Sequence, residues 1–220
     1  FPVLWFINGR CAPDTMLDSG VPWLPAQPYN CMPMMHPGER LLMRVIGGGR
    51  DLHPFHHHGN HARVIARDGR LLESTSGAGA DLSHEVFTIQ SVPGKTADAI
   101  FEWTGKGLGW DIYGHTPEDP LQPNEYAPDH GKPFPVMLPE KQDLTFGAMY
   151  GGSPFLGVQG RLPPGQGTEN AEGFFSYMWH SHTEKEMVNY DVFPGGMMTM
   201  LVIVPPGVPI GMPMEQREEK

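Results

Sequence analysis

The sequence predicts an all-β sandwich, and three observations lead to that fold class. The 220 residues include 28 glycines and 24 prolines, well above average usage. Apolar residues come in short runs between Gly and Pro turns, as they do in strands. No long stretch has the apolar spacing of a helix. The chain is also long enough to bury a substantial core.

The expected strands follow one another between turn signals. Pro37-Gly38 introduces one strand, Asp68-Gly69 closes another, and Pro93-Gly94 separates two more; these dipeptides are typical of turns. On this basis we expect strands at residues 3–7, 39–46, 62–66, 85–89, 99–103, 110–113, 174–179 and 198–204.

The segment 117–171 interrupts this series of strands. Its prolines are too dense for regular structure. A segment of this length is usually functional or part of an interface, although its polarity would also permit disorder. Its aromatic residues favour an ordered arm that contacts a partner. We therefore expect one domain over residues 1–206 with an irregular insertion at about 117–171, followed by a charged tail at 207–220.

Charge and hydropathy exclude two classes of partner. The formal net charge is −10, whereas binding to nucleic acid phosphates requires a basic surface. No run of 18 apolar residues is present, so we expect no membrane span.

Ser181 lacks the Gly-x-Ser-x-Gly context of a hydrolase nucleophile.

Two His-x-His elements, His56/His58 and His180/His182, are the candidate metal ligands. In a strand, residues i and i+2 point to the same face. Each element could therefore direct two imidazoles to one point, and two such strands side by side would gather four. Imidazole suits Cu, Zn, Fe and Ni, so the pattern predicts a metal site without selecting the metal.

The residues around these elements resemble the last cupredoxin domain of multicopper oxidases. In that family a strand with an Asn-Gly turn, a strand introduced by Pro-Gly-Glu and a His-Pro-x-His-x-His-Gly motif follow in order. The resemblance covers residues 1–115 and 172–206 and lies in segments 6–9, 37–46, 53–59, 64–69, 179–182 and 196–204. It implies a cupredoxin-like Greek-key β-sandwich, copper as the metal and a periplasmic or secreted protein.

The sequence departs from the family at the mononuclear blue copper site. Ser181 stands between His180 and His182, where the family has the Cys whose thiolate binds that copper. The second histidine of the site should fall near Glu186. His53, the first histidine by its place in the motif, therefore lacks its partners, and we expect no blue (type 1) copper in this chain.

The positions that would serve the three-copper cluster are all histidines: His56, His58, His180 and His182. The resemblance implies type 2 and type 3 copper, with this chain supplying half of the ligands of an oxygen-reducing trinuclear cluster. Another cupredoxin domain or subunit would supply the rest. The alternative is a non-catalytic cupredoxin-like module that holds one copper or none. Zinc hydrolysis is less favoured, because four protein ligands leave no open position.

The two cysteines and the remaining histidines give weaker signals. Cys11 and Cys31 flank a Pro-rich loop, and their spacing and context favour a disulfide over two thiols. A lone histidine is more often a hydrogen-bonded or surface residue than a ligand. We expect this of His36, His57, His61, His84, His115 and His130, with His57 facing away from His56 and His58.

Overall fold

The computed structural model describes residues 1–104, 106, 111, 115–123, 125–132, 155–156, 175–204 and 207–210. The chain divides into two compact units. The first contains residues 1–33, 40–102 and 178–201, and the second contains 34–39, 103–177 and 202–220. The helical elements of the described residues are short 3₁₀ turns, η1 (Asp14–Met16), η2 (Ala127–Asp129) and η4 (Glu184–Met187). None of the described helices is long and apolar enough to span a membrane.

One sheet of the first unit is built around β8 (Thr96–Glu102). β8 pairs antiparallel with β2 (Arg40–Ile46) on one side and β4 (Ala62–Arg67) on the other. β4 also pairs with β5 (Arg70–Leu71) and β6 (His84–Val86). The side chains of β4 alternate between buried and more exposed positions, as expected where one face of a sheet covers a core.

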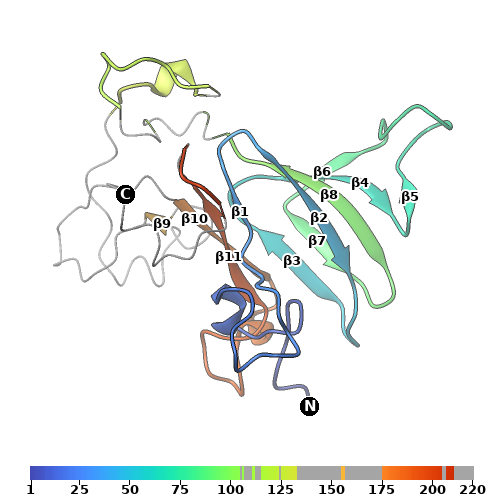
Figure 1. Cartoon of the computed structure of the whole chain (residues 1–220). Coiled ribbons are helices and arrows are strands. Elements are labelled where there is room, and N and C mark those ends of the chain that lie inside the picture. Colours follow the sequence, from blue (N-terminus) through green and yellow to red (C-terminus); the bar gives the residue numbers. More distant parts are fainter. Residues whose placement is uncertain are drawn as a thin grey trace. The chain divides into compact units, whose positions relative to one another are not determined.

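The second sheet places β3 (His53–His57) between β7 (Thr88–Ser91) and β10 (Phe175–Ser181), both antiparallel to it (Figure 1). β11 (Met198–Ile203) lies on the other side of β10. β10 and β11 contribute residues to both units. Within the second unit, β9 (Phe155–Leu156) pairs with β10, and β1 (Met34–Met35) runs parallel to β11.

The core of the first unit contains a cluster of aromatic rings. Phe101 of β8 is fully buried, and its ring centroid lies 5.1 Å from that of Trp179 and 5.8 Å from that of His57. His57 is 1% exposed, and its Nε2 lies 3.1 Å from the Val86 carbonyl oxygen and 3.1 Å from the Ala62 amide nitrogen. As expected from strand alternation, His57 faces the core while its neighbours His56 and His58 face the other side.

The predicted all-β fold class is confirmed, and most predicted strands are present with small changes at their ends. The prediction of a strand at 3–7 is wrong. Ile7 and Arg10 instead close a tight turn through two hydrogen bonds of 2.9 Å, with Asn8 and Gly9 at positive φ. The predicted strand 85–89 is two short strands, β6 and β7, interrupted at Phe87.

Several predictions concern residues outside the described part of the chain. This group comprises most of the predicted strand 110–113, residues 133–154 and 157–171 of the insertion, and residues 211–220 of the tail. The single domain over 1–206 stays a prediction.

The expected disulfide is not formed, and both cysteines are free thiols. The Cys31 thiol donates to the Ile7 carbonyl oxygen at 2.9 Å, and burial raises its pKa to about 11. Burial also raises the pKa of Cys11. The Pro-rich loop between them is instead held by the buried Arg10, whose guanidinium donates to the Gln27 carbonyl oxygen at 2.8 Å and to that of Leu17 at 3.0 Å.

Replacing Phe101 by Ala should lower the free energy of unfolding by about 3–5 kcal/mol, because the removed ring leaves a cavity between Trp179 and His57. Urea denaturation followed by circular dichroism would measure the loss. The matched control is Leu82→Ala, at an apolar side chain that is 56% exposed, which should change stability by less than about 0.5 kcal/mol. Similar losses for both variants would contradict this packing.

Candidate metal centre

The register between β3 and β10 brings the two His-x-His elements together. His56 lies directly opposite His180, and Trp179 lies opposite His57. His58 and His182 lie two residues beyond the central pair, each one residue past the end of its strand, and this spacing places them on the same face as the pair. The His182 amide donates to the carbonyl oxygen of Pro54, near the start of β3, at 2.8 Å.

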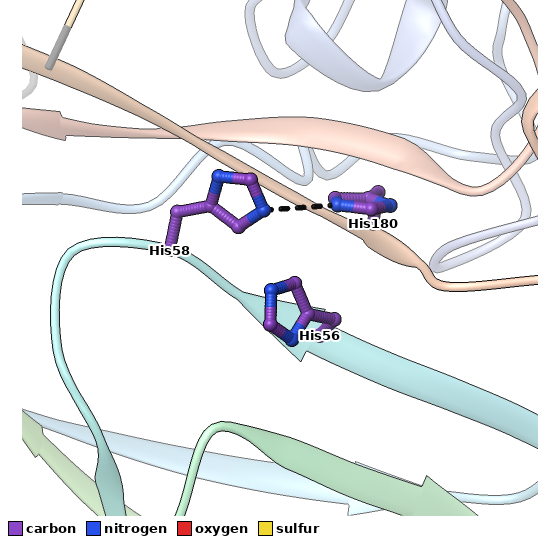
Figure 2. Close-up of side chains that lie close together, drawn as sticks. All are labelled: His56, His58 and His180. Atoms are coloured by element: carbon purple, nitrogen blue, oxygen red, sulfur yellow. Dashed lines mark hydrogen bonds between the residues drawn. The ribbon is translucent and has the colours of Figure 1, made fainter. Parts of the chain in front are cut away.

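Three of the four predicted ligands form a compact cluster (Figure 2). The nitrogens that His56, His58 and His180 offer to a metal all lie within 4.8 Å of one another. The Nε2 atoms of His58 and His180 are 3.1 Å apart, and the ring centroids of His56 and His58 are 4.7 Å apart. Nitrogen ligands lie about 2 Å from a bound ion, so these spacings fit donors that share one or two metal ions.

The fourth predicted ligand, His182, lies at the edge of this cluster. Its ring centroid is 4.9 Å from that of His56 and 5.6 Å from that of His180. It is exposed, whereas His58 and His180 are buried. The structure therefore brings three of the histidines into one group and leaves the fourth beside them on the solvent side. The ligand role of all four stays a prediction.

Hydrogen bonds from Nδ1 orient two of the imidazoles. Nδ1 of His180 donates to the Ser181 carbonyl oxygen at 2.7 Å, and Nδ1 of His56 lies 2.9 Å from the Thr88 hydroxyl. A metal-binding imidazole usually uses one nitrogen for such a contact and the other for the metal. These contacts therefore leave Nε2 as the metal-binding atom of both rings.

The cluster keeps its imidazoles neutral. Burial, followed by the charges of the neighbouring histidines, lowers the pKa of His58 to about 3. Burial also lowers the pKa of His180 to about 4 and lowers that of His56. A neutral imidazole has the lone pair that a metal requires, so near pH 7 the site is ready to bind a cation without first losing protons.

The residues that would correspond to a blue copper site are also brought together, but as a hydrogen-bonded group. Glu186 Oε2 accepts from the Ser181 hydroxyl and lies 2.9 Å from His53 Nδ1. Ser181 and Glu186 are buried. The buried carboxylate therefore has two partners, as a buried charge requires.

The backbone around Glu186 is equally close-packed. Its carbonyl oxygen accepts from the Met197 amide at 2.8 Å, and the Met197 carbonyl oxygen accepts from the Ser181 amide at 2.9 Å. Gly196 has a φ of +60°, and a Cβ there would lie 2.0 Å from the Glu186 carbonyl oxygen. Only glycine fits this position, so the turn fixes Glu186 beside Ser181.

Sequence reasoning missed a second group of metal-binding residue types. His115 and His130 were expected to be hydrogen-bonded or surface residues rather than ligands, and they lie with Asp111 and Glu125 in the second unit. Among the described residues from 115 to 130 the only regular element is the short turn η2, so no strand or helix period relates these side chains to one another. The only sequence signal was the occurrence of two histidines and five acidic residues within residues 111–130.

Comparison with known proteins gives fold-level similarity alone. No family model and no curated protein matches the sequence. Among solved structures, the multicopper oxidase mgLAC aligns with 86% of this chain and 35% of its own, at 15% identity and a TM-score of 0.39. A blue copper oxidase from Nitrosomonas europaea aligns with 98% of this chain and 39% of its own, at 17% identity and a TM-score of 0.44. This chain thus spans well under half of either protein.

The metal-free chain should lose stability as the pH falls from 6.5 to about 4. His57, like His58 and His180, has its pKa lowered by burial, in its case to about 4 from the ordinary 6.5. In this range the unfolded chain binds more protons than the folded chain, so protonation favours unfolding. The loss should be on the order of a few kcal/mol, measured as the urea midpoint against pH. A midpoint that stays constant over this range would contradict the burial of these rings.

The two histidines whose pKa values are raised change the stability of the fold above pH 6.5, outside the range in which the buried histidines act. Partial burial would lower the pKa of His36, but its hydrogen bonds to the Val208 carbonyl and to Glu39 raise it overall. The hydrogen bond to Glu125 raises the pKa of His130. These two groups add stability that is complete below pH 6.5 and is lost as the pH rises through their folded-state values. Their effect therefore does not oppose the loss below pH 6.5.

Replacing Ser181 by Cys should not create a blue copper centre, because the Glu186 carboxylate remains between residue 181 and His53. Copper added to S181C should give no intense thiolate-to-copper absorption band. The double variant S181C/E186H supplies the thiolate and two imidazoles that such a site requires. This variant should show the thiolate-to-copper absorption band. A strong band from S181C alone would show that Glu186 does not block the site.

Proposed function

We propose that this chain is a copper-binding domain of an oxidoreductase of the multicopper oxidase type. In this proposal His56, His58, His180 and His182 supply half of the histidine ligands of a trinuclear copper cluster that reduces oxygen. The observation that carries the proposal is the convergence of His56, His58 and His180 from two adjacent, antiparallel strands.

The chemistry of the donors suits copper, and the family resemblance is what selects copper among the metals that imidazole binds. Among the described residues, the group consists of imidazoles alone, and they are neutral near pH 7 because burial lowers their pKa values. A nitrogen donor set of this kind suits copper, whereas carboxylate or thiolate donors would favour other ions. Bound copper would supply the one-electron chemistry that oxygen reduction needs. The protein's part is to hold the rings in place through Thr88 and the Ser181 carbonyl.

The uneven burial of the cluster supports a partner on one side. His58 and His180 are buried, His56 is half-buried and His182 is exposed. Four histidines are half of the set that the family resemblance implies. We therefore propose that another cupredoxin domain or subunit covers the exposed side and completes the cluster. The part of the insertion that would assist this contact lies outside the described residues.

Electrons would have to reach such a cluster from a site outside this chain. His53 is engaged by Glu186, and Ser181 offers a hydroxyl in place of a thiolate. In this proposal the blue copper site therefore belongs to the partner. The predicted location outside the cytoplasm belongs to the same proposal.

A non-catalytic module is the second candidate, and the Ser181–Glu186–His53 group is the observation that favours it. This group satisfies its own hydrogen bonds without a metal, as a domain retained for structure alone would need. Copper content separates the two candidates, because a structural module requires no high-affinity site at His56, His58 and His180.

Replacing His180 and His182 by Ala should abolish copper retention while the sandwich stays folded. The double change removes one of the two neighbouring His-x-His elements. Because the loss of even an outer contact of a metal site typically weakens binding about 10- to 100-fold, the loss of two ligands should have a larger effect. Copper per chain would be measured by elemental analysis after gel filtration, with circular dichroism to check the fold.

His61→Ala is the matched control, because His61 is an exposed imidazole whose ring lies 5.3 Å from Phe87, beside the cluster. It should retain copper like the unsubstituted chain. Copper retention by H180A/H182A equal to that of the unsubstituted chain would exclude the proposed ligands. An unsubstituted chain that is folded but binds no copper would leave the structural module as the better account.

A further inference from the structure

A second cluster of metal-binding side chains lies in the second unit. Asp111, His115, Glu125 and His130 each offer a ligand atom, and these four atoms lie within 4.8 Å of one another. The Asp111 and Glu125 side chains are 1% and 4% exposed, and those of His130 and His115 are 12% and 19% exposed. Carboxylates so completely removed from solvent need strong partners.

The distances in this cluster are those of ligands around one ion. Nδ1 of His115 lies 3.5 Å from Asp111 Oδ2 and 3.5 Å from Glu125 Oε1, and Nδ1 of His130 lies 3.7 Å from Asp111 Oδ2. Two ligands at about 2.1 Å from an ion in tetrahedral coordination are about 3.4 Å apart. The fourth histidine–carboxylate pair, His130 and Glu125, is in direct contact and would have to separate by about 1 Å to admit the ion.

Backbone amides hold the two carboxylates in position. The Gly131 amide donates to Asp111 Oδ2 at 2.8 Å. The Gln122 amide donates to Glu125 Oε2 at 2.8 Å, which leaves Oε1 for the centre of the cluster. Outer contacts of this kind orient the ligands of metal sites.

The local chain also supports a role for a bound ion. Among the described residues from 115 to 132, the only regular element is the short turn η2. Asp111 joins this segment through its amide, which donates to the Lys132 carbonyl oxygen at 2.9 Å. A cation bound by Asp111 and by three residues of the segment would tie the irregular chain together, as structural metals do in small units.

We propose that Asp111, His115, Glu125 and His130 form a binding site for a divalent first-row transition metal ion, of the zinc or iron(II) type. Two imidazoles suit Zn and Fe, and two carboxylates add the harder oxygen donors that disfavour Cu(I). The two carboxylates also balance the charge of a divalent cation. This site is independent of the proposed copper cluster, because it shares no residue with it.

Zinc binding by the chelator-treated chain tests the proposal, with His180→Ala present in every sample to weaken the first cluster. This background should retain one zinc per chain after gel filtration, measured by elemental analysis. Glu125→Gln keeps the size of the side chain but removes the charge. It should weaken zinc binding by at least about 100-fold, since the loss of an outer contact alone costs about 10- to 100-fold.

Glu118→Gln is the matched control, because Glu118 is an exposed carboxylate of the same segment. It should keep the zinc. The proposal is overturned if E125Q retains zinc, if E118Q loses it equally, or if the folded background binds none, in which case the four residues form an ion-pair network only. Should E125Q fail to fold, anomalous scattering from zinc-soaked crystals of the unsubstituted chain decides. A peak among the four side chains supports the site, and a peak only elsewhere overturns it.

Discussion

The antiparallel pairing of β3 with β10 is the constraint on which the rest of the first unit depends. It sets His56 opposite His180 on one face and His57 opposite Trp179 on the other. A slip of one residue would exchange these faces, placing the candidate ligands in the core and the aromatic cluster in solvent. The packing of Phe101 against Trp179 and His57 therefore serves the candidate metal site as well as the core, since it fixes the register that gathers the imidazoles.

A buried hydrogen-bonded group lies on the other face of the same strands. The Glu186 carboxylate makes hydrogen bonds to the Ser181 hydroxyl and to His53. Glu186 therefore has partners from two strands, β10 and β3. Changing Ser181 or His53 would leave the buried carboxylate without part of its hydrogen bonding, which is costly. The three residues therefore depend on one another and form a single unit.

The parts that the sequence predicted well are those governed by a regular period. The strand period of two placed His56, His58 and His180 on one face and turned His57 inward, and turn dipeptides located β2, β4 and β8. Irregular parts were not predictable in this way. Val3–Ile7 has an apolar strand-like pattern, but Ile7 closes a turn at Asn8 and Gly9 by bonding to Arg10, and the Val3 carbonyl accepts from the Tyr190 amide. The convergence of Asp111 and Glu125 on two histidines follows from loop geometry, which no spacing rule describes. Cys11 and Cys31 are close in sequence but do not form a disulfide.

The Nε2–Nε2 contact between His58 and His180 has a consequence for the kinetics of metal entry. Because His180 donates from Nδ1 to the Ser181 carbonyl oxygen, its Nε2 must accept, and in the neutral metal-free pair the proton between the rings belongs to His58 Nε2. A cation that takes this place requires His58 to move its proton to Nδ1. The exchange changes the tautomer without changing the number of bound protons. Occupancy at equilibrium should therefore depend little on pH above 6.5, whereas the rate of loading should depend on how quickly water or buffer carries that single proton around the ring.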